Sequence, residues 1–190
     1  MTAASRTAIG FRVKSGFAVA VVVDGSAAAP RAVVRRIVDM SDPDAPETRQ
    51  PYHHDFFKSE RDSREIARRV RIVRRSAQAS VAALLADVGA ARAALVVGSL
   101  IDPATVGNPH IRAHAREGQL FRTVLAEMLQ AHGVACDVVV DRELPAQAWR
   151  RLKRPGASVT RTMAAFGEAL GRPWRADEKA AALAAWMALA

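Results

Sequence analysis

The sequence has very little cysteine and few aromatic residues. Cys136 is the only cysteine among 190 residues, and aromatic side chains make up 5% of the chain. A single cysteine excludes an intramolecular disulfide and a zinc site made of several thiolates. The shortage of aromatics argues against the series of stacking rings with which many proteins bind single-stranded nucleic acids.

Long hydrophobic runs are also missing. No window approaches the roughly 18–20 apolar residues that span a bilayer, and the opening stretch MTAASRTAIGF lacks the apolar region of a signal peptide. We therefore expect a cytoplasmic protein without a membrane partner. Half of the 190 residues are hydrophobic, which is enough to bury one core. We expect a single domain over residues 1–190.

Two common catalytic motifs are absent as well. The sequence contains no glycine-rich Walker loop, which would cradle the phosphates of a nucleotide. Ser99 follows an apolar run, but its flanks VVGSLID lack the second glycine of a nucleophile elbow. Ser99 is therefore only a candidate contact for an anion.

Acidic residues are outnumbered by basic ones. The chain has 28 Lys and Arg against 19 Asp and Glu, a net charge of +9. This excess favours an anionic partner, nucleic acid first, although the arginine-rich and alanine-rich composition of a GC-rich genome would also produce it. Five arginines lie in RRVRIVRR (68–75), and we expect them largely off the apolar stripe of a helix. Arg68, Arg71 and Arg75 are candidate phosphate contacts, with a simple solvated face as the alternative.

Three strand-like segments come first. Residues 7–14 alternate between apolar and polar, and residues 16–24, GFAVAVVVD, form the nearly continuous apolar run of a strand covered on both sides. The KSG between them is short enough for a hairpin turn. Residues 31–39 predict a third strand. Residues 40–57 carry three prolines and no clean period, which predicts a long surface loop.

Helices and short strands alternate in the rest of the chain. The expected helices cover residues 59–88, 108–133, the short segment LPAQAWRRLKR, 158–170 and 177–189, and the expected strands cover 93–98 and 134–141. Asn108 is a good N-cap for the second of these helices. The expected core stripe of the last helix consists of Leu183, Trp186, Met187 and Ala190.

This order predicts an α/β fold. The first three strands have hairpin-length connections and should be antiparallel neighbours, whereas strands separated by helices should be parallel, with right-handed crossovers. The predicted product is a mixed five-stranded sheet, three antiparallel strands followed by parallel strands with crossover helices, and helices on both faces.

Ligands of open α/β sheets bind outside the carboxyl ends of the strands. The residues that the predicted strands bring to this edge are Lys14 and Ser15, Ser99 and Asp102, and Asp141 and Glu143. The helix that begins at Asn108 points its free N–H groups to the same edge. We expect these groups to line one site.

The stretch HIRAHARE places two histidines and an acid on one face of that helix. His110 and His114 are four residues apart, and Glu117 follows three residues later. Two imidazoles and a carboxylate are suited to a metal ion. Protonated imidazoles with Arg112 or Arg116 nearby would instead suit a phosphate, and a solvated first turn with incidental histidines is the third option.

A second group of histidines lies in the predicted loop. PYHHDFF (51–57) contains His53, His54 and Asp55, and a loop can carry such groups over a cleft. Neighbouring histidines tend to point apart, so a metal ion here needs ligands from another segment. An incidental role is the alternative.

The order of elements and the last segment together carry a resemblance. Three strands, a helix, a strand, a helix, a strand and further helices resemble the ribonuclease H-like fold. RADEKAAALAAWMAL (175–189) resembles the closing helix of RuvC-type resolvases, where an acid precedes a run of Ala and Leu. The resemblance implies a nuclease site in which carboxylates hold two Mg²⁺ or Mn²⁺ ions against a phosphodiester.

The acids that the resemblance requires are partly missing. The first-strand position falls at Arg12 or Lys14, and the fourth-strand position falls near Gly98 or Ser99. The closing helix keeps Asp177 and Glu178. A cation beside a two-metal site repels the ions that the site must hold. The standard metal site is therefore predicted to be degenerate, Arg12 and Lys14 become candidate anion contacts, and Arg12 needs a carboxylate or a ligand as partner.

Three functions remain as hypotheses. The first is a ribonuclease H-like domain that binds nucleic acid or another anionic ligand without two-metal nuclease activity. The second is an active nuclease or resolvase that uses Mg²⁺ or Mn²⁺ with a displaced set of acids and with His110 or His114 as general acid or base. The acids of this set are drawn from Asp102, Asp141, Glu143, Asp177 and Glu178. The third is a non-catalytic scaffold in which the loop at 40–57 docks a protein partner, and a homodimer is one option for its assembly.

Overall fold

The computed structural model describes residues 6–55 and 58–190, and these form a five-stranded mixed sheet. The strands are β1 (Arg6–Lys14), β2 (Phe17–Gly25), β3 (Pro30–Asp39), β4 (Arg92–Val97) and β5 (Ala135–Val140). Their order is β3-β2-β1-β4-β5, so β1 is the central strand. The first three strands are antiparallel, and β1, β4 and β5 are parallel. The predicted α/β sheet is confirmed.

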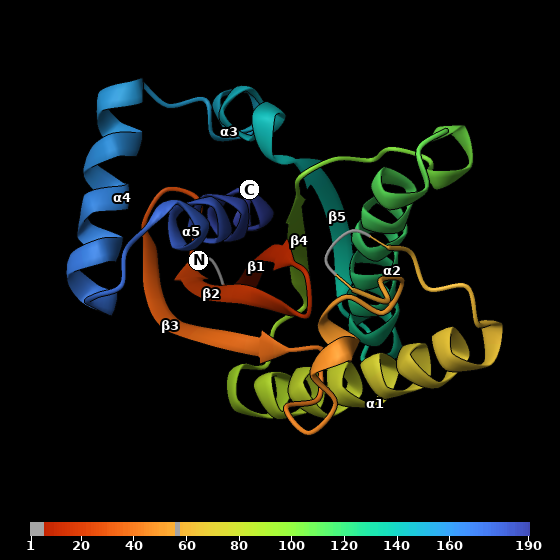
Figure 1. The fold of residues 1–190 in the computed structure, drawn as a ribbon. Helices are drawn as coiled ribbons and strands as arrows, with labels where there is room; N and C mark the ends of the chain where they lie inside the picture. Colours follow the sequence, from red (N-terminus) through yellow and green to blue (C-terminus); the bar gives the residue numbers. More distant parts are fainter. Residues whose placement is uncertain (1–5, 56–57) are drawn as a thin grey trace.

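Helices cover both faces of the sheet, as predicted (Figure 1). One face carries α1 (Ser63–Val88) and α2 (Pro109–Ala131), and the other carries α3 (Leu144–Leu152), α4 (Gly156–Leu170) and α5 (Ala176–Leu189). Three short 3-10 helices lie in the connections: η1 (Pro46–Arg49), η2 (Pro103–Thr105) and η3 (Asp141–Glu143). No helix within the described ranges is long and apolar enough to cross a membrane.

The apolar run of β2 has two buried faces. Ala18, Ala20 and Val22 pack in the core beneath α1 and α2, whereas Val21 and Val23 pack in the second core beneath α5. A strand that is covered on both sides has no solvent-facing position for polar residues, which is why its sequence does not alternate.

The closing helix α5 differs from its prediction. The expected stripe included Ala190, which is exposed, and the buried set includes Ala181, Ala185 and Met187 from several sides of the helix. The helix lies directly on β1, where Gly10 has no side chain to hold it away. Small residues nearly all round the helix allow this close approach, so the prediction of a single apolar stripe was wrong.

The segment at 40–57 is not simply a surface loop, and residues 56 and 57 lie outside the described residues. Thr48 and His53 are buried, and Tyr52 packs against the core beneath α1 and α2. Arg69 of α1 is also buried, as the one exception among the five arginines of 68–75 that were predicted to lie largely off the apolar stripe, and its Nη1 donates to the carbonyl of His53 at 2.7 Å. The arginine is buried because it satisfies the backbone of this segment.

Candidate functional site

The carboxyl end of β1 carries two cations that pair with acids from two other elements. Arg12 Nη2 donates to Oδ2 of Asp141 at 3.0 Å, and Arg12 Nε lies 3.4 Å from Oδ1 of Asp177. Lys14 Nζ lies 3.4 Å from the Asp177 carboxylate. Asp141 directly follows β5, and Asp177 lies in the first turn of α5. These four residues form what we call the edge network.

Charges balance within the edge network, because two cations face two carboxylates. The side chain of Arg12 is only 12% exposed, and a guanidinium removed from water on a central strand must be paired. The structure thus supplies the carboxylate partner that the sequence required. The carboxylates that would otherwise attract divalent cations are already occupied by cations of the chain itself.

Two of the acids predicted for this site lie elsewhere in local roles. Glu178 is buried, and its carboxylate accepts a hydrogen bond from the backbone N–H of Arg175 at 2.8 Å, which caps α5. Asp102 is exposed and accepts from the backbone N–H of Ala104 at the start of η2. Ser99 is exposed in the turn after β4. Of the predicted acids, Asp141 and Asp177 pair with Arg12.

Arg12→Met is expected to lower the free energy of unfolding by about 2 kcal/mol, less than the roughly 3–5 kcal/mol of fully buried pairs because both acids are partly exposed. The variant leaves Asp141 without its guanidinium partner and Asp177 with Lys14 alone, so the local charge becomes net negative and Mg²⁺ should stabilise the variant more than the wild type. Urea denaturation with and without Mg²⁺ measures both effects. The control is Arg31→Met, because Arg31 forms a surface pair with Asp24. Equal losses in the two variants would contradict a special role for Arg12.

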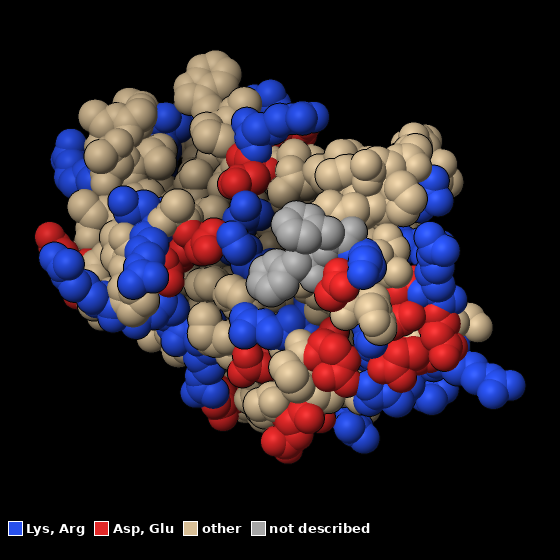
Figure 2. All heavy atoms as spheres, viewed as in Figure 1, with Lys and Arg blue, Asp and Glu red and all other residues tan. Residues whose placement is uncertain are grey.

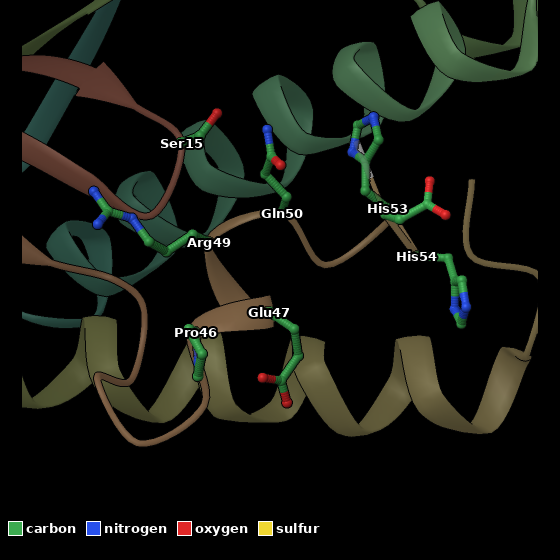
Figure 3. A pocket seen from close by; sticks show the side chains of 8 residues that line it. Ser15, Pro46, Glu47, Arg49, Gln50, His53 and His54 are labelled. Carbon is green, nitrogen blue, oxygen red and sulfur yellow. The ribbon is translucent and has the colours of Figure 1, made fainter. Parts of the chain in front are cut away.

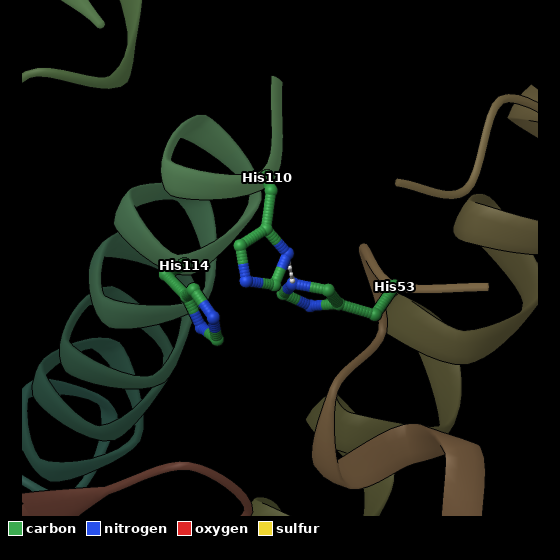
Figure 4. A group of neighbouring side chains, drawn as sticks. All are labelled: His53, His110 and His114. Carbon is green, nitrogen blue, oxygen red and sulfur yellow. Dashed lines mark hydrogen bonds between the residues drawn. The ribbon is translucent and has the colours of Figure 1, made fainter. Parts of the chain in front are cut away.

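A cluster of three imidazoles lies beside this edge (Figure 4). His53 comes from the segment between η1 and α1, whereas His110 and His114 lie in the first turns of α2, which begins at the N-cap Asn108. His53 Nε2 lies 3.2 Å from His110 Nδ1. The three residues each offer one ring nitrogen, and these nitrogens all lie within 4.8 Å of one another. We call them the histidine cluster.

Glu117 lies behind the histidine cluster and is 1% exposed. Its Oε1 is 2.7 Å from Nδ1 of His53 and accepts a hydrogen bond from the backbone N–H of Tyr52 at 3.3 Å. Its Oε2 lies 3.5 Å from Nδ1 of His114 and has no hydrogen-bond partner of good geometry among the described residues. The acid predicted as a third ligand is therefore a partner of two rings.

Burial shifts the pKa values of Glu117 and of two of the histidines. It raises the pKa of Glu117 from the ordinary 4.5 to about 7 and lowers the pKa values of His53 and His114 below 6.5. Each shift disfavours the charged form of a group that folding removes partly or fully from water. Near neutral pH, His53 and His114 are thus neutral imidazoles, each with one nitrogen lone pair to offer.

A cavity of about 410 Å³ extends from the β1–β2 turn to His53 and His54 (Figure 3). Its lining runs from Ser15 in the β1–β2 turn, past Arg49 and Gln50, to His53 and His54. Arg49 points toward the turn, and the ring of His53 points toward α2. The lining thus combines the guanidinium of Arg49 and the two imidazoles with the carboxylates of Glu47 and Asp55.

The arginines predicted as phosphate contacts are mostly engaged within the protein. Arg68 pairs with Glu47 and Glu65, and Arg75 lies 3.6 Å from Asp42. Figure 2 shows basic and acidic side chains interspersed over the face in view. A continuous basic surface is therefore not formed there.

Two further candidate arginines differ in their surroundings. Arg112 donates to the backbone carbonyls of Val106 and Gly107 and so holds the loop before α2. Arg71 is exposed and makes no ion pair within the described part of the chain. Of the two, only Arg71 keeps an unengaged charge.

Solved structures of T. thermophilus RuvC are similar to this chain. RuvC in complex with a Holliday junction substrate matches with a TM-score of 0.54 and 12% identity, over 96% of this chain and 91% of that chain. A second Thermus thermophilus RuvC structure matches with a TM-score of 0.53 and 12% identity, over 95% and 92%. No protein-family model matches, and a search of curated proteins gives no significant match. The likeness shows the fold alone: the chain has the ribonuclease H-like fold in the form found in RuvC.

Proposed function

We propose that this protein binds nucleic acid and that its edge network replaces the acidic metal site of a nuclease. The observation that carries the proposal is the position of Arg12, on the central strand and between two carboxylates. A two-metal nuclease needs such carboxylates free to hold ions at the attacking and leaving oxygens. Here a divalent cation would first have to displace a guanidinium, and it would be repelled by that guanidinium as it approached.

Two observations support nucleic acid as the partner. The net charge of +9 attracts polyanions, and the RuvC structure with the same fold holds a Holliday junction substrate.

Arg142 is an exposed cation immediately beyond the carboxyl end of β5. Its side chain makes no ion pair with any residue that the structure describes, so its charge is available to a phosphate.

Affinity for a junction or a duplex DNA should fall steeply as the salt concentration rises, because each phosphate contact releases counterions. Arg142→Gln should lower the slope of log K against log salt by about 0.9, the value of one phosphate contact. Arg92→Gln is the matched control, because it removes an exposed arginine from the amino end of β4, at the opposite edge. Fluorescence anisotropy over a salt series measures both slopes.

The same preparations test the alternatives. We expect no cleavage of junction, duplex or hybrid substrates with Mg²⁺ or Mn²⁺. Cleavage that disappears in Asp141→Asn and Asp177→Asn would overturn the proposal in favour of an active nuclease. Absence of binding at low salt would instead favour the hypothesis of a scaffold for a protein partner.

A further inference from the structure

One distance in the histidine cluster matches that between two ligands on one ion, and the third ring lies close enough to join them by a side-chain rotation. Two nitrogens bonded to a tetrahedral Zn²⁺ at about 2.0–2.1 Å lie about 3.3 Å apart, and His53 Nε2 lies 3.2 Å from His110 Nδ1. The widest pair of ligand nitrogens is no more than 4.8 Å apart. The ring of His114 is 45% exposed and can rotate to shorten its distance.

Glu117 orients two of the three rings in a way that suits metal binding. When its carboxylate is ionised, it accepts a hydrogen bond from Nδ1–H of His53 and faces Nδ1 of His114. A proton on Nδ1 leaves the lone pair on Nε2 of each ring. A carboxylate behind a ligating histidine is a recurrent arrangement in metal sites, because it fixes the tautomer and the orientation of the ring.

One carboxylate oxygen behind the histidine cluster is unsatisfied by the residues that the structure describes. Oε2 of Glu117 is buried and has no hydrogen-bond partner among the described residues. A buried carboxylate is costly unless it has positive charge or donors nearby. A cation held by the two rings in front of Glu117 would provide that charge.

We propose that His53, His110 and His114 bind one divalent transition-metal ion of the Zn²⁺ class, with Glu117 as the residue that orients two of the ligands. Three imidazole nitrogens favour such an ion over Mg²⁺ or Ca²⁺, which prefer oxygen ligands. The exposed side of His114 leaves a fourth position for water. The ion would join the segment after η1 to the start of α2.

Calorimetric titration of untagged, chelator-treated protein with Zn²⁺ or Co²⁺, without nucleic acid, tests this site. We expect one ion per chain, ligand-field bands of tetrahedral Co²⁺, and a higher melting temperature in the presence of the ion. His110→Ala and His114→Ala should abolish binding, and both positions are accessible enough for the variants to fold. Glu117→Gln should weaken binding by about 10–100-fold, as loss of an outer partner does.

His132→Ala is the matched control, because His132 is exposed at the far end of the same helix and its ring lies against the carbonyl of Met128, away from the histidine cluster. It should bind the ion as the wild type does. Uptake of less than one ion per chain, or equal binding by His110→Ala, His114→Ala and the wild type, would overturn the assignment. Because no nucleic acid is present, the result is separate from the proposed function.

Discussion

Gly10→Ala is expected to prevent stable folding. A Cβ at this position would overlap the backbone carbonyl of Ala181 and lie 2.5 Å from the backbone nitrogen of Ala185. Backbone atoms cannot rotate away as a side chain does, and β1 is fixed by hydrogen bonds to β2 and β4 on its two sides. The loss should therefore exceed the roughly 1–3 kcal/mol of ordinary overpacking and consume much of the roughly 5–15 kcal/mol that stabilises a domain.

Thermal unfolding followed by circular dichroism measures the effect of Gly10→Ala. Gly118→Ala is the matched control: it makes the same chemical change on the exposed side of α2, where a Cβ would meet no atom within 4 Å. Alanine has the higher helix propensity, so this control should gain up to about 1 kcal/mol. A melting temperature of Gly10→Ala close to that of the wild type would contradict the packing of α5 on β1.

Trp186→Ala should cost about 3–5 kcal/mol, the range for removal of a large buried aromatic side chain. Trp186 is fully buried, with its ring edge-to-face against Phe166 at 6.0 Å between centroids. Its Nε1–H donates to the carbonyl of Ala27 at 3.0 Å, and Arg154 lies over the ring. The substitution therefore leaves a cavity and also removes the donor from a backbone carbonyl.

Urea denaturation at constant pH measures this loss as a lower midpoint with an unchanged slope. Trp149→Ala is the control, since that ring is 68% exposed and its removal creates no cavity. Its stability should stay within about 0.5 kcal/mol of the wild type, as for most surface substitutions. Similar losses in the two variants would show that Trp186 does not anchor α5.

The order and pairing of elements could be predicted because each depends on local pattern. The apolar run of β2, the hairpin-length KSG and the N-cap Asn108 all have short-range causes, and all three are found in the structure. Which faces of α5 are buried could not be predicted from local pattern. Its alanines do not show from sequence whether a helix is buried on one side or nearly all round, since that depends on how closely β1 allows it to approach.

The same distinction between local pattern and tertiary packing applies to the candidate sites. His110 and His114 belong to one helix, so their shared face follows from helical spacing. His53 joins them from 57 residues away from His110, and that proximity depends on how the segment at 40–55 folds across the core. The signal for it was present in the paired histidines of PYHHDFF. The partners of Arg12 could likewise not be predicted from local pattern, because β1, the end of β5 and the start of α5 must all meet to form these pairs.

The packing of α5 has a consequence for synthesis on the ribosome. β1 and β2 are translated first, yet the helix that covers one apolar face of both is translated after every other element of the fold. The central strand also waits for β4, its parallel neighbour, before its second edge is paired. Until α5 emerges, the nascent chain exposes the valines and alanines of that face, which is the kind of surface that chaperones bind and that aggregates when left uncovered. The elements therefore cannot reach their native packing one after another in the order of synthesis. The sheet gains its second covered face only when α5 docks.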